Sequence, residues 1–221
     1  ISDFESEKIL NDAVKSGITT FDTAPNYGTS QQVLGNYFAK SHFPRTVITK
    51  IPKIETKSNN SKFEDVFYEV KAILKNSKKS LNDEIQICLL HDPKDIHSND
   101  GFVVDSLIRL KKDGIIKMIG VSTYTPQDVN DFLNISQFDT IEIPVNIFDT
   151  RLIKNGLIQK LNEFKKTIFA RSVFLQGLFF IPANELPVNL KFAKHELVKL
   201  QKLSNKFQIS ILDIVFGFVH Q

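Results

Sequence analysis

The chain has 221 residues, of which 42% are hydrophobic and 24% charged, and its formal net charge is +3. This length allows a sizeable core, and the balance excludes a disordered or strongly basic chain. Because Lys residues are scattered along amphipathic stretches, as in Lys71–Lys75, they indicate solvated helix faces rather than a nucleic-acid surface.

The cysteine content and the hydropathy of the sequence indicate the cellular compartment of the protein. The single cysteine, Cys88, leaves no internal disulfide and fits a reducing environment. The sequence has no apolar run near the roughly 20 residues that span a bilayer, and its N-terminus is polar rather than signal-like. We therefore expect a cytoplasmic protein that binds neither membrane nor nucleic acid. The five His and one Cys show no metal-ligand spacing, so no metal site is expected.

Helix-like and strand-like segments alternate along the chain. Strands are expected at short apolar runs: 18–21, 46–49, 85–90, 116–121, 141–145 and 168–170. Helices are expected where apolar residues recur every three or four positions: 3–16, 31–38, 63–78, 102–112, 127–133, 152–165, 194–206 and 210–219. The least regular segments, 53–61 and 181–189, do not have the character of linkers, so we expect one domain over 1–221.

Continuously apolar strands separated by helices predict an α/β fold with parallel strands that are covered on both faces. An open doubly wound sheet and a (β/α)8 TIM-type barrel both fit this alternation. A dinucleotide-binding doubly wound sheet carries a glycine-rich turn after its first strand. Here Gly28 stands alone after the first strand, which favours the barrel.

Ionisable residues follow three consecutive predicted strands. Asp22, Lys50 and His91 stand at the strand ends, and Tyr27 lies on the loop after the first of these strands. Because the active site of a (β/α) barrel lies at the C-terminal strand ends, and neighbouring strands are about 4.8 Å apart, these side chains can converge. An ammonium beside a tyrosine lowers its pKa from about 10, and a carboxylate holds that ammonium in place. Such a group would protonate a carbonyl oxygen, oriented by a neutral His, while a hydride reaches the carbon.

At these residues the sequence resembles the aldo-keto reductase family. Residues 13–28, continued by Leu34-Gly35, are similar to the segment around the family's Asp and Tyr. Residues 47–50 are similar to the strand that bears its Lys, and 89–91 to the strand that bears its His. Residues 120–122 and 172–177 are similar to its cofactor-contacting strand ends. Their order matches the family along nearly the whole chain. The resemblance implies a barrel that binds NADPH, or less often NADH, and has no Rossmann domain.

The resemblance also implies roles for individual residues. Tyr27 would be the general acid/base, Lys50 would depress its pKa, Asp22 would pair with Lys50, and His91 would orient the carbonyl. By the resemblance, Ser122 and Thr123 would contact the nicotinamide carboxamide. Ser172, Phe174 and Gln176 would lie along the pyrophosphate.

Three residues depart from the family pattern. Thr123 stands where Asn is frequent, Glu142 where a Gln contacts the carboxamide, and Arg171 where an aromatic ring stacks on the nicotinamide. The planar Arg171 guanidinium could stack in the same way, or it could form an ion pair inside the barrel. By the same resemblance, the first and eighth strands lie outside Ile1–Gln221, so we expect an incomplete barrel of about six strands. Either the sequence is trimmed from a longer protein, which we favour, or the molecule lacks these strands and binds its cofactor weakly.

The leading functional hypothesis is reduction of an aldehyde, ketone or sugar-type carbonyl by NAD(P)H, or the reverse. The polar residues Glu142 and Arg171 favour a hydroxyl-rich substrate. One alternative is an aldolase-type barrel in which Lys50 forms a Schiff base. Another is a non-catalytic member of the same family that acts as a binding or regulatory subunit.

Overall fold

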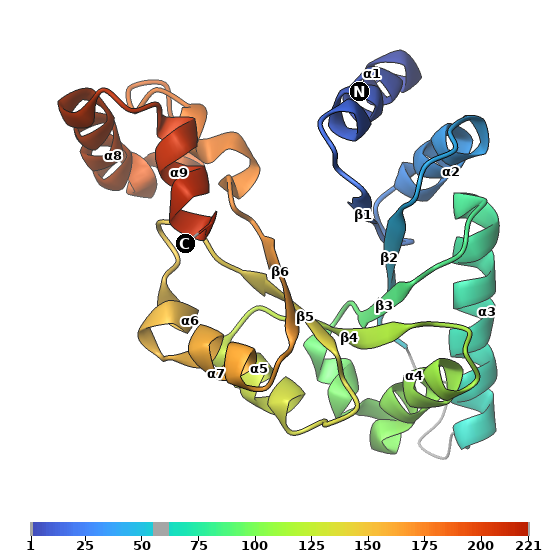
Figure 1. The fold of residues 1–221 in the computed structure, drawn as a ribbon. Coiled ribbons are helices and arrows are strands. Elements are labelled where there is room, and N and C mark those ends of the chain that lie inside the picture. The colour runs from blue at the N-terminus through green and yellow to red at the C-terminus, as the bar shows by residue number, and fades with distance from the viewer. Residues whose placement is uncertain (1, 55–61, 221) are drawn as a thin grey trace. The chain divides into compact units, whose positions relative to one another are not determined.

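The computed structural model describes residues 2–54 and 62–220, and these contain six strands in one sheet (Figure 1). The strands neighbour one another in sequence order. Their bounds are β1 Thr20–Asp22, β2 Thr46–Ile51, β3 Ile87–Leu90, β4 Met118–Ser122, β5 Thr140–Pro144 and β6 Thr167–Arg171. The pairings of β1 with β2, β2 with β3 and β3 with β4 are parallel.

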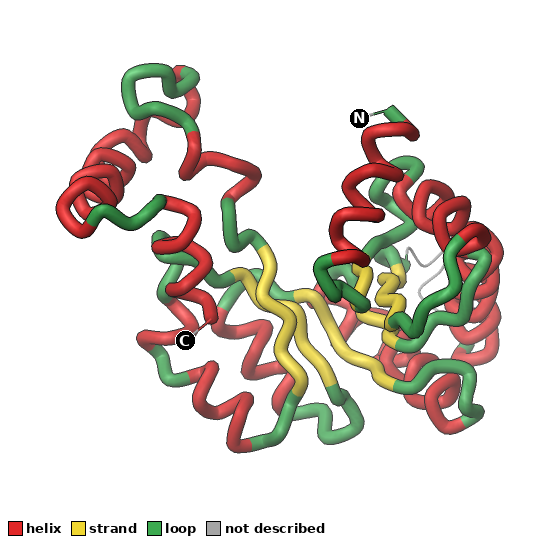
Figure 2. The backbone as a smooth tube through the Cα atoms, turned by 45° about the horizontal axis from the view of Figure 1, so that its top comes forward, coloured by secondary structure: helices red, strands yellow, loops and turns green. Residues whose placement is uncertain are grey.

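Helices separate successive strands along the chain (Figure 2). The α-helices are α1 Asp3–Lys15, α2 Ser30–Lys40, α3 Phe63–Leu81, α4 Phe102–Lys112, α5 Pro126–Leu133, α6 Arg151–Lys154, α7 Leu157–Glu163, α8 Lys194–Phe207 and α9 Ile211–His220. The 3-10 helices are η1 Pro93–Ile96, η2 Ser98–Gly101, η3 Leu175–Phe180 and η4 Val188–Ala193. The alternation and the parallel pairing confirm the predicted α/β class.

The described residues form two compact units. The first is Ile1–Thr123 with Gln127–Ile141, and the second is Tyr124–Pro126 with Glu142–Gln221. The prediction of one domain over 1–221 stays a prediction, and each unit is described by itself below.

Central strands hold the first unit together. The residues of β3 are all buried, and Val47, Ile51 and Leu90 have no exposed surface. Because each such side chain stabilises a fold by about 1.5–3 kcal/mol, these continuously apolar runs become buried strands. They fix the positions of the residues that follow them.

The helices α2, α3 and α4 lie side by side along these strands (Figures 1 and 2). α3 contributes the buried stripe of Val66, Val70 and Leu74, which is the spacing of one helix face. α2 approaches α3 closely at Gly35, where an added Cβ would lie 2.1 Å from the carbonyl oxygen of Ser80. Glycine at this position therefore lets α2 pack tightly, and the loop that precedes α2 is held with it.

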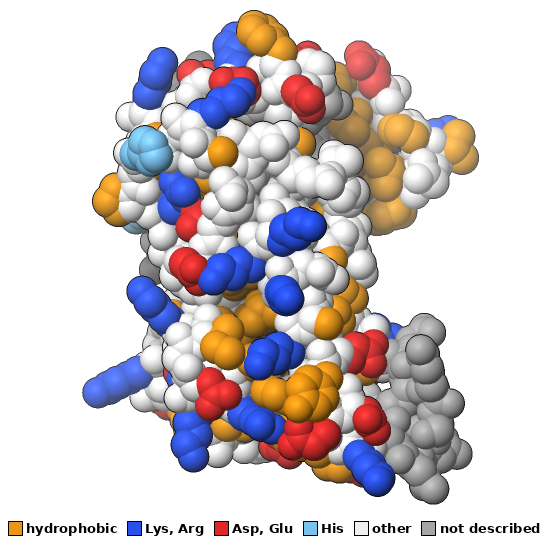
Figure 3. Space-filling view, turned by 90° about the vertical axis from the view of Figure 1, so that its right-hand side faces the viewer, with side chains coloured by type: hydrophobic (Ala, Val, Ile, Leu, Met, Phe, Trp, Pro, Cys, Tyr) orange, Lys and Arg blue, Asp and Glu red, His pale blue; other side chains and the backbone are white. Residues whose placement is uncertain are grey.

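The helix surface of this unit is solvated. Figure 3 shows basic and acidic side chains interspersed on one face of the molecule, and Lys71 and Lys75 of α3 are exposed, as their scattered spacing predicted. An exposed ion pair joins Arg109 to Glu64 at 3.0 Å, of the kind that contributes about 0–1 kcal/mol. None of the described helices has the length and apolar character needed to cross a bilayer.

A separate apolar cluster forms the core of the second unit. Its buried residues come from η3, η4, α8, α9 and the segment between the two 3-10 helices: Leu178, Phe179, Leu186, Ala193, Leu197, Leu200 and Val215. The segment after β6 is therefore held by this core, although it has little regular structure. The sequence predicted this irregularity for 181–189.

Two expectations about the elements need correction. The prediction of a single helix over 152–165 is wrong, because Gly156 takes a φ of +66° and separates α6 from α7. The first strand begins at Thr20 rather than at residue 18. Most of the irregular segment expected at 53–61 lies outside the described residues.

Candidate functional site

Tyr27 lies in a tight turn between β1 and α2. Its N–H donates to the carbonyl of Ala24 at 3.1 Å, and Pro25, which has its φ fixed by its ring, stands at the second position of that turn. Gly28 follows with a φ of +56°, a conformation that side chains with a Cβ disfavour. The chain thus turns sharply on both sides of Tyr27, and the ring stays 44% exposed.

Hydrogen bonds tie this turn to β2. The N–H of Thr23 donates to the carbonyl of Ile48 at 3.0 Å, and its hydroxyl donates to Ser30 at 2.9 Å. The buried amide of Gln31 donates to the hydroxyl of Thr49 at 2.9 Å. Residues on both sides of Tyr27 are therefore hydrogen-bonded to β2, the strand that bears Lys50.

Lys50 and Asp22 form an ion pair across β1 and β2. The Nζ atom of Lys50 lies 2.6 Å and 2.5 Å from the two carboxylate oxygens of Asp22. The Lys50 side chain is 0% exposed, whereas that of Asp22 is 38% exposed. Because an unpaired buried ammonium is costly, the carboxylate is what allows a charged lysine at this depth.

The four predicted side chains meet at Tyr27. The Nζ atom of Lys50 lies 5.1 Å from the centroid of the Tyr27 ring. The His91 ring meets the same ring edge-on, with centroids 5.5 Å apart and planes at 86°. His91 directly follows β3, and its N–H donates to the carbonyl of Ile51 at 3.0 Å. The predicted convergence is thus observed, while the catalytic roles stay predictions.

Cys88 lies within β3, beside the strand that bears Lys50, and not at a strand end, so the strand-end pattern in the sequence does not indicate it. It pairs in register with Thr49, the neighbour of Lys50, and its side chain has no exposed surface. Burial raises the pKa of the Cys88 thiol from 9.0 to about 12, against an opposing effect of the Lys50 charge. The thiol is therefore uncharged at neutral pH and unsuited to act as a nucleophile.

The burial of Cys88 predicts a pH dependence of stability. A thiol whose pKa is 9.0 when unfolded and about 12 when folded releases its proton more readily from the unfolded chain, so the free energy of unfolding should fall as pH rises from about 9 to 12. Urea unfolding of wild type and Cys88→Ala at pH 8, 9.5 and 11 measures this. The two proteins should converge in stability as pH rises, and parallel pH profiles would contradict the prediction.

The end of β4 places two hydroxyl groups in the interior of the first unit. Ser122 is 2% exposed and Thr123 is 0% exposed. Tyr124, which follows them, belongs to the second unit and is 46% exposed.

In the second unit, Arg171 at the end of β6 contacts an aromatic ring and a carboxylate. Its guanidinium carbon lies 4.3 Å from the centroid of the Tyr124 ring, a stacking distance. Its Nε atom lies 3.9 Å from a carboxylate oxygen of Glu142, which is 7% exposed. The ion pair raised as one alternative for Arg171 is therefore observed with Glu142, whereas stacking of Arg171 on a nicotinamide stays a prediction. Sequence reasoning missed Tyr124, although its place directly after a strand-end Ser-Thr pair was a usable signal.

The loop after β6 has an unusual backbone. Ser172, Leu175 and Gln176 have φ values of +57°, +45° and +54°. The ring of Phe174 packs against that of Phe180, with centroids 5.9 Å apart, so Phe174 borders the core of this unit. Successive N–H groups in such mixed right- and left-handed conformations can form a concave anion-binding surface.

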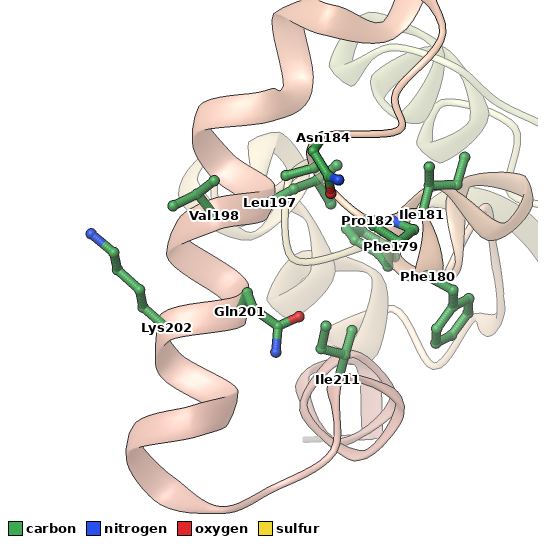
Figure 4. Close-up of a pocket in the computed structure, with 11 residues that line it drawn as sticks. Phe179, Phe180, Ile181, Pro182, Asn184, Leu197, Val198, Gln201, Lys202 and Ile211 are labelled. Atoms are coloured by element: carbon green, nitrogen blue, oxygen red, sulfur yellow. The ribbon is translucent and has the colours of Figure 1, made fainter.

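The second unit also has a cavity of about 480 Å³ between the segment 179–184 and helices α8 and α9 (Figure 4). Its walls are mostly apolar, and Lys202 is the ionisable residue among those that line it. Figure 4 shows the Lys202 side chain extending away from the other labelled residues. This cavity therefore lacks the acid and base groups found around Tyr27. Among the residues that the structure describes, no three His, Cys, Asp or Glu side chains form a potential metal site.

Solved structures share this fold. A glycerol dehydrogenase from Gluconobacter oxydans superposes with a TM-score of 0.75 at 23% identity, over 99% of this chain and 74% of that one. An aldo/keto reductase from Klebsiella pneumoniae, crystallised with NADP and acetate, gives 0.70 at 16% identity, over 98% and 71%. At these identities the likeness shows the fold alone, and it confirms the predicted (β/α)8-type barrel, with six strands in the described residues.

Sequence comparisons agree with the structural ones. An aldo-keto reductase from Mycolicibacterium vanbaalenii is 30% identical over 142 residues, which are 62% of this chain and 47% of that protein. An uncharacterized oxidoreductase of Bacillus subtilis, YqkF, is 24% identical over 174 residues, 77% and 56% of the two chains. The chain thus spans about half the length of these relatives. The family model for the aldo/keto reductase family matches residues 1–210, and the chain therefore belongs to that family.

Proposed function

We propose that this protein reduces a carbonyl to an alcohol with NAD(P)H, or catalyses the reverse reaction, and that Tyr27 is its proton donor. The observation that carries the proposal is the Lys50 ammonium, buried, paired with Asp22, and 5.1 Å from the Tyr27 ring.

Each member of the group has a defined task in this mechanism. Tyr27 donates its hydroxyl proton to the oxygen of the bound carbonyl. The Lys50 ammonium stabilises the phenolate that remains, and Asp22 keeps the ammonium charged and in place. His91, beside the Tyr27 ring, hydrogen-bonds the substrate oxygen as negative charge builds on it. The exposed edge of the ring is where the substrate enters.

The loop after β6 is the part of the second unit that we propose to bind a nicotinamide dinucleotide. The left-handed backbone at Ser172, Leu175 and Gln176 supports this, because such a backbone suits a diphosphate. We propose that Ser172, Phe174 and Gln176 hold the diphosphate. The contact of Ser122 and Thr123 with the carboxamide stays a prediction. A bound reduced cofactor would supply the hydride.

Arg171 and Glu142 are proposed to flank the nicotinamide. Arg171 is 3.9 Å from the Glu142 carboxylate and stacks on Tyr124, so a charged pair stands where neutral groups are usual. We propose NADPH as the preferred cofactor, since related structures hold NADP and NADPH. A small polar carbonyl compound, such as a sugar derivative, is the substrate class that this charged lining favours. The single Cys, buried and reduced, supports a cytoplasmic location.

The structure disfavours the aldolase-type alternative. Schiff-base formation needs a neutral, accessible amine, whereas Lys50 has no exposed surface and lies 2.5 Å from a carboxylate oxygen of Asp22. This lysine is placed to act as a fixed charge rather than as a nucleophile.

A titration of NADPH fluorescence with the purified chain, followed by a panel of aldehydes, ketones and sugars, tests the proposal. We expect saturable binding and substrate-dependent oxidation of NADPH. Borohydride trapping of a substrate on Lys50 without any NADPH binding would replace the proposal with the aldolase mechanism. NADPH binding without turnover across the panel would instead support a non-catalytic member of the family.

A further inference from the structure

Asn146, two residues after the end of β5, joins two loops of the second unit. Its side chain is 1% exposed. Its Oδ1 atom accepts hydrogen bonds from the N–H groups of Phe148 and Asp149, both at 2.9 Å. Its Nδ2 atom donates to the backbone carbonyl of Ser172 at 3.2 Å. One buried amide thus closes its own turn with its oxygen and reaches the loop after β6 with its nitrogen.

The carbonyl that Asn146 holds belongs to a residue in an unfavourable conformation. Ser172 has a φ of +57°, a region sparsely populated by residues with a Cβ. The same carbonyl accepts the N–H of Leu175 at 3.2 Å. Asn146 and Leu175 therefore fix the direction of the peptide at which the chain leaves β6 and enters the left-handed segment.

We propose that Asn146 is a positioning residue for the loop 172–177. By holding the Ser172 carbonyl, it keeps the loop in the conformation that receives the diphosphate of the cofactor, so that little ordering remains to be done on binding. Such preorganisation raises affinity without any contact between the residue and the ligand. This inference rests on the proposed function, because it assigns the loop to cofactor binding.

The substitution Asn146→Asp isolates the one hydrogen bond concerned. The two side chains have nearly the same shape, and the carboxylate still accepts from Phe148 and Asp149. At pH 8, however, an oxygen replaces the donor that faces the Ser172 carbonyl, so this side-chain hydrogen bond is lost while the backbone bond from Val145 to Arg171 remains. Protonation of the buried aspartate at lower pH restores an O–H donor.

Neighbouring charges should not obscure this titration. Asp149 pairs with Arg151 at 2.7 Å, and that hydrogen bond lowers the pKa of Asp149, so it keeps its charge between pH 6 and 8. A further cationic group beside Ser172 is Arg171, whose Nη1 atom donates to the Ser172 hydroxyl at 3.3 Å. Wild type measured over this range corrects for titration of the cofactor.

Two measurements follow. Hydrogen exchange without any cofactor should show amides of 172–177 exchanging about fivefold to tenfold faster in Asn146→Asp at pH 8, the effect of one lost hydrogen bond. The dissociation constant for NADPH should rise by a similar factor and recover as pH falls to 6. Asn155→Asp, which changes an exposed asparagine of the same unit, is the matched control and should resemble wild type.

A second variant guards against misfolding of the first. Asn146→Ser keeps a short acceptor for the turn but does not reach Ser172, and it buries no charge. It should show the faster exchange and weaker binding at every pH, without the recovery.

The possible outcomes separate the two proposals. Wild-type exchange rates at 172–177 in both variants would overturn the positioning role. Faster exchange with unchanged NADPH affinity would show that the loop is held for some purpose other than the cofactor, and would overturn the inference as stated. If wild type binds no NADPH, the proposed function fails, while hydrogen exchange still decides whether Asn146 holds the loop.

Discussion

Tyr27→Phe should lower kcat for carbonyl reduction by about 10²–10⁴-fold, the usual contribution of a positioned proton donor. The phenyl ring keeps its contact with the His91 ring, whose centroid is 5.5 Å away, and with the Nζ atom of Lys50, which lies 5.1 Å from the ring centroid. Only the hydroxyl is lost, so NADPH affinity should remain that of wild type. Steady-state kinetics on the best substrate of the panel, together with an NADPH titration, measure both parts.

Tyr68→Phe provides the control for this experiment. Tyr68 lies on α3 and is 63% exposed, so removal of its hydroxyl should leave kcat unchanged. If Tyr27→Phe retains full activity while binding NADPH normally, another group donates the proton and the proposed mechanism is wrong.

Asp22→Asn should destabilise the protein more than Lys50→Met does. Loss of the carboxylate leaves the ammonium of Lys50, which is 0% exposed, without its counter-charge. Breaking a buried pair in this way costs about 3–5 kcal/mol, and we expect about 3 kcal/mol because Asp22 is itself partly exposed. Lys50→Met leaves a carboxylate that water can reach and an apolar side chain in the interior, so we expect a cost of about 1 kcal/mol.

Urea unfolding of the two variants measures this asymmetry. The exposed pair of Lys78 and Glu84, with side chains 53% and 67% exposed, supplies the control, and Lys78→Met and Glu84→Gln should each change stability by less than about 1 kcal/mol. Equal costs for Asp22→Asn and Lys50→Met would mean that Lys50 loses its charge when its partner is removed. Both site variants should also lose activity, since the phenolate of Tyr27 is no longer stabilised.

The part of the site that lies on consecutive strands could be predicted from the sequence. Parallel strands in sequential order bring their C-terminal ends to one edge, so residues at or just after the ends of β1, β2 and β3 must be neighbours. Asp22, Lys50 and His91 are found together for this reason. Tyr27 joins them because a Pro and a Gly on either side leave the chain few ways to turn.

Contacts that depend on tertiary packing could not be predicted in the same way. The amide of Asn146 reaches Ser172, which is 26 residues away in the sequence, and no local pattern marks such a pair. Tyr124 becomes a partner of Arg171 only when the segment 124–126 is placed against the end of β6 within the second unit. The break at Gly156 was missed because a glycine within a periodic apolar pattern is compatible with both a helix and a helix end.

Cys88 offers a consequence of a different kind. The Cys88 thiol is fully buried on β3, in register with Thr49, the neighbour of Lys50. It can react with a labelling reagent only when β3 separates from its neighbours. Its modification rate under native conditions therefore measures the free energy of that sub-global opening. The modification rate of Cys88 thus reports how often β3 separates from its neighbouring strands. A decrease in that rate on addition of a ligand would measure how far the ligand stabilises these strands.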